Sequence, residues 1–227
     1  MSRARADRRV VVNLHGIGDP PPGVPQDEMR FWCPRNEWPD IADALAEASS
    51  EGRGVEITFD DGNTSDVEEA LPALVQRGLT ATFHVCAGRI GQLGYLDSQA
   101  LLHLREAGMS VGSHGWDHVD LRTLSDTDLV RATRGSREHI AEVCGAPVTR
   151  FAVPLGSYDR RVLQHLRDYQ TVYTSDTTSA RAPSRLVPRW SYVQGWTAEF
   201  VTELVRGGES LRHRWRQQAA MVAKRWR

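Results

Sequence analysis

The feature that most constrains the fold of this chain is a repeated alternation of short apolar strands with amphipathic helices. Apolar segments rich in β-branched residues, which favour strands, are 10–14, 55–59, 80–85, 111–113, 148–153 and 171–174. Segments with helical spacing are 40–48, 65–78, 98–107, 125–143, 159–169 and 197–206. Alternation of this kind is typical of a parallel sheet with helices outside, either open or closed into a (β/α) barrel.

The segment that follows the second strand carries the clearest local signals. Ser65 is followed three residues later by Glu68, a spacing that predicts a capping box at the start of a helix. Pro72 lies inside the same helical pattern and should kink it, because proline removes a backbone donor. Residues 19–25 are rich in proline and predict a loop.

Length and composition predict an ordinary globular protein. The chain has 227 residues, of which 40% are apolar and 25% are charged. We expect one catalytic domain over residues 1–210, followed by a basic helix or tail over 211–227. The net charge of −1 argues against a nucleic-acid partner, because such proteins usually carry a basic excess.

The cysteines and the hydropathy of the sequence indicate in which cellular compartment the protein is expected. Cys33, Cys86 and Cys144 are far apart and odd in number, which disfavours a disulfide framework or a zinc ribbon. No apolar run is long enough to cross a bilayer, and the apolar run near the start is too short for a signal peptide. We therefore expect a cytoplasmic protein.

Two polar segments stand where an active site should form. Thr58-Phe59-Asp60-Asp61-Gly62 ends one expected strand, and Ser113-His114-Gly115-Trp116-Asp117-His118 ends another. In parallel α/β folds, ligands gather at the carboxyl ends of the strands. We expect the two segments to meet at one site.

The histidine spacing predicts a metal site. His114 and His118 are four residues apart, which can place both imidazoles on one face of a helical turn. One carboxylate, from Asp60 or Asp61, would complete a set of two histidines and one acid with open positions. The other carboxylate would then be free to act as a general base.

These two motifs resemble those of the polysaccharide deacetylases, the NodB-homology family or carbohydrate esterase family 4. The resemblance spans about residues 10–196 and implies a distorted (β/α) barrel that removes N-acetyl groups from amino sugars with a divalent metal. By position, it implies that Asp60 is the catalytic base and that Asp61, His114 and His118 hold the metal. Zinc is the expected ion, with cobalt, nickel, iron and manganese as alternatives.

The later motifs of the family are altered in this sequence. The family's oxyanion-stabilising backbone N–H corresponds to Leu155, in Pro154-Leu155-Gly156. The family's arginine that pairs with the base is Ala152 here, and Arg189, after a late strand, is the candidate replacement. The family's general-acid histidine has no match, and His15, at the end of the first strand, is the best substitute.

Other residues are candidates for contact with the substrate or with a membrane. Aromatic faces stack on sugar rings, and the substrate-binding candidates are Trp116, Tyr158, Trp190 and the acidic Asp176. The basic segment 211–227 carries Trp215 and Trp226 and has two interpretations. It could contact an anionic membrane surface, or it could be a solvated helix that closes the floor of the barrel.

The sequence therefore predicts a metal-dependent N-deacetylase. Its expected substrate is an N-acetylated amino sugar in a glycoside, a sugar nucleotide or a lipid-linked precursor. A hydrolase of another small C–N bond on the same scaffold is one alternative. A degenerate relative that binds sugar or metal without turnover is the other, since an arginine and a histidine of the family pattern are missing.

Overall fold

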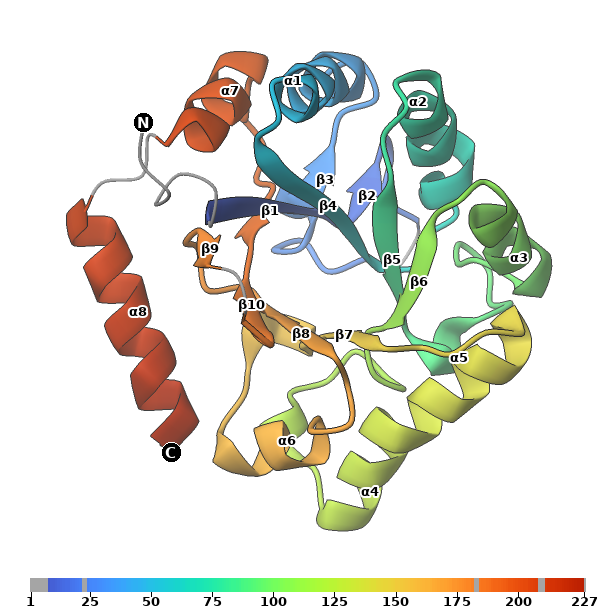
Figure 1. Cartoon of the computed structure of the whole chain (residues 1–227). Coiled ribbons are helices and arrows are strands. Elements are labelled where there is room, and N and C mark those ends of the chain that lie inside the picture. Colours follow the sequence, from blue (N-terminus) through green and yellow to red (C-terminus); the bar gives the residue numbers. More distant parts are fainter. Residues whose placement is uncertain (1–7, 22–23, 182–183, 208–210, 227) are drawn as a thin grey trace.

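The computed structural model describes residues 8–21, 24–181, 184–207 and 211–226. Its parallel strands are β1 (Arg8–Leu14), β4 (Gly54–Asp61), β5 (Ala81–Val85), β6 (Ser110–Ser113), β7 (Arg150–Ala152), β8 (Thr171–Thr174), β10 (Leu186–Pro188) and β11 (Trp190–Ser191). They are hydrogen-bonded in the order β10-β8-β7-β6-β5-β4-β1-β11, and Figure 1 shows that they curl into a nearly closed barrel with helices outside. The expected barrel is confirmed.

The helices around the barrel follow the predicted alternation. They are α1 (Trp38–Ser50), α2 (Leu71–Gln76), α3 (Ser98–Glu106), α4 (Asp126–Val130), α5 (Ser136–Cys144), α6 (Arg160–His165) and α7 (Ala198–Arg206). A π-helical turn over Arg131–Gly135 joins α4 to α5, so the long helix expected over 125–143 is confirmed. Ser125 caps its start by accepting from the N–H of Asp128, and Gly145 ends it with a left-handed φ of 64°.

The capping box expected at Ser65 is wrong. Ser65 has helical backbone angles (φ −59°, ψ −18°), and its side chain makes no capping bond. A cap residue needs an extended backbone to turn its side chain toward the first helical N–H groups. The hydroxyl of Ser65 instead accepts a hydrogen bond from the N–H of Ile17 at 3.2 Å, which ties the helix to the loop after β1.

The strands are buried on both of their faces. Phe59 and Phe83, paired on adjacent strands, are 0% exposed on the face toward the helices. Thr58 and His84, from the same two strands, point to the opposite face and are also 0% exposed. Phe59 stacks on Phe83 with ring centroids 4.9 Å apart, and Trp38 of α1 meets Phe59 edge-on at 5.8 Å. Each such ring contributes about 1.5–3 kcal/mol by leaving water.

The seam of the barrel lies between two strands that are consecutive in the chain. β10 pairs with β8 at one edge of the sheet, and β11 pairs with β1 at the other. Arg189 is the one residue between β10 and β11, so the chain crosses the seam there. Its side chain is fully buried, which places a charged group inside the barrel.

A small second sheet forms on either side of the predicted loop 19–25, where the sequence analysis predicted no strand. β2 (Gly16–Ile17) pairs in parallel with β3 (Trp32–Cys33), and a short helical turn, Met29–Phe31, precedes β3. Gly16 permits this pairing, because a Cβ at that position would lie 2.4 Å from the Trp32 ring. The segment between β2 and β3 returns to the carboxyl ends of the barrel strands.

The remaining elements are β9 (Ala180–Arg181), which pairs antiparallel with β1, and α8 (Leu211–Trp226). Figure 1 shows α8, in red, on the outer side of the barrel near β9 and β10. Arg227 lies outside the described residues. Cys33, Cys86 and Cys144 are free and buried. In the described part of the chain, no helix combines the length and the hydropathy that a membrane span requires.

Candidate metal centre and active site

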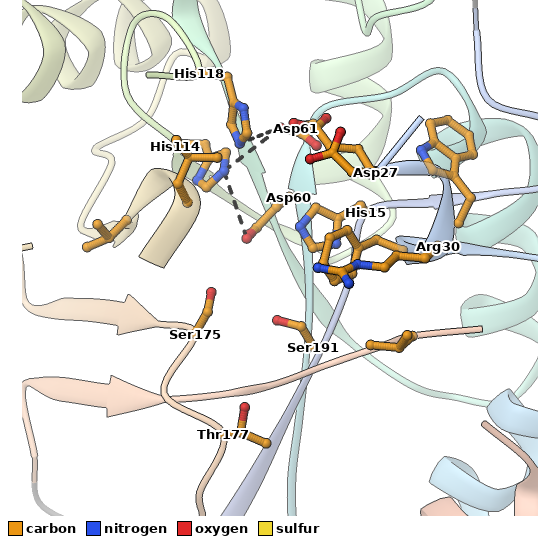
Figure 2. Close-up of a pocket in the computed structure, with 16 residues that line it drawn as sticks. His15, Asp27, Arg30, Asp60, Asp61, His114, His118, Ser175, Thr177 and Ser191 are labelled. Carbon is orange, nitrogen blue, oxygen red and sulfur yellow. Dashed lines mark ion pairs between the residues drawn. The ribbon is translucent and has the colours of Figure 1, made fainter. Parts of the chain in front are cut away.

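A pocket of about 400 Å³ opens at the carboxyl ends of the barrel strands. Both predicted motifs reach it, and a third contribution comes from the segment between β2 and β3 (Figure 2). The residues that line it are His15, Asp27, Glu28, Arg30, Phe31, Trp32, Asp60, Asp61, His114, His118, Val153, Leu155, Ser175, Thr177, Ser191 and Val193.

Three of these residues form a group suited to a metal ion. Nε2 of His118 lies 3.6 Å from Oδ1 of Asp61, and Nε2 of His114 lies 3.8 Å from the same oxygen. The three ligand atoms all lie within 4.8 Å of one another. Ligand atoms on one zinc ion are separated by roughly 3–4 Å, since each bond is about 2.0–2.2 Å long. The arrangement therefore fits a single small divalent cation with only modest adjustment.

The surroundings of the two histidines prepare them to act as ligands. Nδ1 of His114 lies 2.9 Å from the carbonyl oxygen of Ala152, so this nitrogen carries the proton and Nε2 is left free. Burial lowers the pKa of both His114 and His118, despite the carboxylates nearby. Neutral imidazoles with a free lone pair are the form that binds metal.

Asp61 has a strained backbone conformation and lies beside the guanidinium of Arg89. Its φ of 79° is left-handed, which is unfavourable for a residue other than glycine. Burial raises the pKa of Asp61, although His15 and Arg89 act in the opposite direction. Nη1 of Arg89 lies 3.3 Å from Oδ1 of Asp61, so this carboxylate is paired with a partly exposed arginine.

Asp60 has a different environment, although it is the adjacent residue. Arg189 donates to both of its oxygens, from Nη1 to Oδ1 at 2.8 Å and from Nη2 to Oδ2 at 2.6 Å. Nδ2 of Asn13 donates to Oδ2 at 3.2 Å, and Nδ1 of His84 donates to Oδ1 at 3.2 Å. Burial alone would raise the pKa of Asp60, but Arg189, His114 and His84 hold it well below its usual value.

The seam of the barrel positions Arg189. Its guanidinium also donates to Oδ1 of Asn13 at 2.8 Å and to Oγ1 of Thr58 at 3.1 Å. The structure therefore brings Arg189 to Asp60, as the sequence suggested. The sequence analysis did not point to Asn13 or His84, because both lie inside expected strands rather than at their ends.

Leu155 lies in the loop after β7 and lines the pocket. It has a left-handed φ of 57°, and its side chain is 56% exposed. The N–H of Gly156 donates to the carbonyl of Val153 at 3.1 Å, which closes a tight turn with Pro154 and Leu155 at its centre. Among the described residues, Asp61 and Leu155 are the two non-glycine positions with positive φ, and both face this pocket.

His15 also lines the pocket, on the side opposite His114 (Figure 2). Its ring lies 5.1 Å from that of Phe31, and its Nδ1 is buried without a hydrogen-bond partner. Burial lowers the pKa of His15, although Asp61 and Asp60 act to raise it. The ring is therefore available for a hydrogen bond to a bound molecule.

The substrate-binding candidates chosen from the sequence lie outside the described lining of the pocket. Trp116 packs under Arg131, whose guanidinium carbon lies 4.6 Å from the ring centroid, and approaches Gly88. Tyr158 and Asp176 are buried and bonded to each other, with the phenol oxygen 2.7 Å from Oδ2 of Asp176. Trp190 packs against the core. The sequence could show that these residues follow strands, but not which way their side chains point.

The comparisons with known proteins agree with this geometry. The family model described as "Polysaccharide deacetylase" matches residues 47–174, more than half of the chain. The chain belongs to the polysaccharide deacetylase family. The match includes Asp60, Asp61, His114, His118 and Leu155, whereas His15 and Arg189 lie outside it.

Curated relatives are similar over part of their length. A putative polysaccharide deacetylase, YxkH, of Bacillus subtilis is 28% identical over 108 residues, which are 48% of this chain and 39% of the relative. The peptidoglycan-N-acetylglucosamine deacetylase PgdA of Listeria monocytogenes is 28% identical over 113 residues, 49% of this chain and 23% of the relative. The chain thus matches less than half the length of these relatives.

Solved structures share the fold. The deacetylase PplD of Streptococcus pyogenes, in complex with acetate, has a TM-score of 0.75 at 18% identity, covering 89% of this chain and 99% of that one. IcaB from Ammonifex degensii has a TM-score of 0.73 at 22% identity, covering 88% of this chain and 98% of that one. These likenesses support the fold.

Proposed function

We propose that this protein is a metal-dependent N-deacetylase acting on an N-acetylated amino sugar. The observation that carries the proposal is the contrast between Asp60 and Asp61 at one pocket. Asp61 joins two neutral histidines in a set that fits a cation, while Arg189 keeps Asp60 ionised and aimed at the same space. Amide hydrolysis by activated water requires this division of labour.

Asp61, His114 and His118 would hold the metal. The donor set of two imidazoles and one carboxylate suits zinc, and cobalt, nickel, iron or manganese would also fit. A divalent ion at this position supplies Lewis-acid activation of water and of the amide carbonyl.

Asp60 is assigned the role of general base. Its carboxylate would take a proton from the attacking water, and the fork of Arg189 holds both oxygens in place. A low pKa makes Asp60 a weak base in isolation. It would suffice here, because a divalent ion held by Asp61, His114 and His118 would lower the pKa of the attacking water.

Leu155 and His15 complete the proposed mechanism. The left-handed turn at Leu155 offers a backbone N–H to the oxygen that becomes negative when the carbonyl is attacked. His15, with its free Nδ1 in the pocket, would hand a proton to the leaving amine. The amine then leaves as a neutral group, and acetate is the second product.

The size of the pocket supports a sugar-sized substrate. A cavity of about 400 Å³ is at the small end of ligand pockets, which typically measure about 300–1,000 Å³. Asp27, Glu28 and Arg30 contribute to the lining, so polar groups would face a bound sugar ring from this segment. We propose a single N-acetylated unit, in a glycoside, a sugar nucleotide or a lipid-linked precursor.

Acetate release tests the proposal. The full chain, loaded with zinc, is assayed on N-acetylglucosamine, its uridine diphosphate conjugate, a chitin oligosaccharide and peptidoglycan fragments, with and without a chelator. We expect acetate from at least one of them, and its loss with the chelator. Asp117→Asn is the control, because this exposed acid lies between the two histidines in the sequence but outside the pocket lining. Metal binding without acetate release from any of them would favour the degenerate relative.

Two further expectations remain predictions. A cytoplasmic location would appear as recovery from the soluble cell fraction. A loose membrane contact through 211–227 would appear as a bound fraction that salt removes.

A further inference from the structure

The chain contains a single lysine, and its amine makes a specific contact although its side chain is 34% exposed. Of the 28 basic residues, Lys224 alone is a lysine, and all the others are arginines. It lies in α8, which is anchored by the buried Met221. Nζ of Lys224 is 2.6 Å from Oδ1 of Asp176 and 3.4 Å from the carbonyl oxygen of Gly156. A helix remote in sequence therefore reaches two loops at the mouth of the barrel.

The partner of the lysine is a buried carboxylate with a second fixed contact. Asp176 follows β8 and is 3% exposed. The phenol of Tyr158 donates to its other oxygen at 2.7 Å, and Nζ of Lys224 lies 5.1 Å from the Tyr158 ring centroid. Burying a carboxylate without a cation nearby costs folding free energy. Tyr158 donates a hydrogen bond but carries no charge, so Lys224 supplies the positive charge that Asp176 requires.

The loops joined by this contact are the ones that flank the pocket. Gly156 directly follows Leu155, the strained residue whose N–H we assign to the oxyanion. A Cβ at Gly156 would lie 3.0 Å from Cβ of Ser175, so the two loops are in close contact. Ser175 and Leu155 both line the pocket, whereas Lys224 and Asp176 are not among its lining residues.

We propose that Lys224 is a positioning residue, which clamps the loops after β7 and β8 and so holds the Leu155 turn in place. The proposal makes α8 a part of the active-site architecture. The effect on the reaction rests on the proposed function, whereas the clamp itself does not. The conservative replacement, Lys224→Arg, retains the charge, and Lys224→Met keeps most of the stem but removes the charge.

Labelling of the single lysine tests the contact directly. Val222 is 51% exposed on the same helix, so V222K introduces a free reference amine into the same molecule. The V222K protein is reductively methylated in the folded state, and the two ε-amines are compared by mass spectrometry. We expect Lys224 to react about tenfold more slowly than the introduced lysine, the protection expected from one strong polar contact. Asp176→Asn, added to V222K, should abolish the difference. Equal rates without that change would overturn the proposal.

Hydrogen exchange tests positioning without any assay of activity. In Lys224→Met, the amides of Val153 and of residues 155–158 should exchange about tenfold faster than in the unaltered chain, while those of 54–61 stay unchanged. Lys224→Arg should restore most of the protection. Arg216→Met, which removes an exposed charge from the same helix, is the control. Unchanged exchange of Val153 and of residues 155–158 in a folded Lys224→Met protein would reduce the contact to a surface ion pair and overturn the proposal.

Kinetics test the consequence for the reaction. On a substrate that releases acetate, Lys224→Met should lower kcat by about tenfold, the usual cost of losing a supporting partner, with KM and metal content within twofold. Lys224→Arg should recover most of kcat. An unchanged kcat would contradict the positioning role. If the unaltered chain releases no acetate at all, the proposed function fails, and the exchange experiment still decides the clamp.

Discussion

Asp60 and Asp61 are adjacent and chemically identical, yet the barrel gives them opposite surroundings. Asp60 is enclosed by an arginine, an asparagine and a histidine, and its pKa is held well below the usual value. Asp61 faces two neutral histidines across the pocket, and burial raises its pKa. The difference shows that the pKa of each carboxyl is set by its neighbours, which other strands and loops contribute. Alternation along the strand only points the two side chains in different directions.

The largest expected effect, on metal content and acetate release, comes from a change in the group formed by Asp61, His114 and His118. His118→Ala removes one of the three proposed metal ligands, so the purified protein should contain far less than one metal ion per chain. Acetate release should fall to background, because the remaining two ligands hold zinc poorly. Metal analysis beside the assay measures both. Full metal content in the variant would mean that the ion binds elsewhere.

A large effect on stability is expected when Asp60 loses its ion pair with Arg189. Arg189→Met leaves the buried Asp60 carboxylate without its main partner, which should cost about 3–5 kcal/mol of unfolding free energy. Urea unfolding measures this, with the exposed Arg167→Met as control. The double variant Asp60→Asn with Arg189→Met should regain part of the loss. No loss in the single variant would show that the pair does not stabilise the fold.

The pair of Asp60 and Arg189 also predicts how the free energy of unfolding depends on pH in chelator-treated protein. The direction of that dependence should reverse in Arg189→Met. The folded pKa of Asp60 lies below the unfolded value of about 3.9. Its stabilisation is therefore complete above that pH and is lost as pH falls toward the folded pKa. In Arg189→Met, burial should dominate and raise the folded pKa, so the contribution should be lost as pH rises above about 4. Parallel stability curves for the two proteins would contradict this.

A smaller effect is expected from the third partner of Asp60. His84→Phe keeps a ring against Tyr173, whose centroid lies 5.0 Å away, and removes the donor to Asp60. Loss of one hydrogen bond to a charged group should cost about 1.5–3 kcal/mol. We expect kcat to fall less than in any variant of Asp60 itself. A larger fall than that of Asp60→Asn would mean that His84 acts directly on the substrate.

The sequence predicted the parts of this molecule that depend on local patterns. Alternating strands and helices predicted the barrel, and strand-end motifs placed Asp60, Asp61, His114 and His118 together. Arg189 was found only as a replacement for an expected arginine. The features that the sequence did not predict depend on long-range packing. The part of the pocket lining within 27–32 requires β2 to pair with β3. Trp116 is not in the pocket lining, because its ring packs against Gly88 and Arg131.

The division of labour between the two aspartates is the central claim, and paired variants test it most directly. Metal content per chain and steady-state kinetics are measured for Asp60→Asn and Asp61→Asn on one substrate that releases acetate. Asp60→Asn should keep one metal ion and lose about 10²–10⁴-fold in kcat with little change in KM, as expected for a general base. Asp61→Asn should lose metal and recover part of its activity when metal is added in excess. Loss of metal in Asp60→Asn with retention in Asp61→Asn would contradict the assignment.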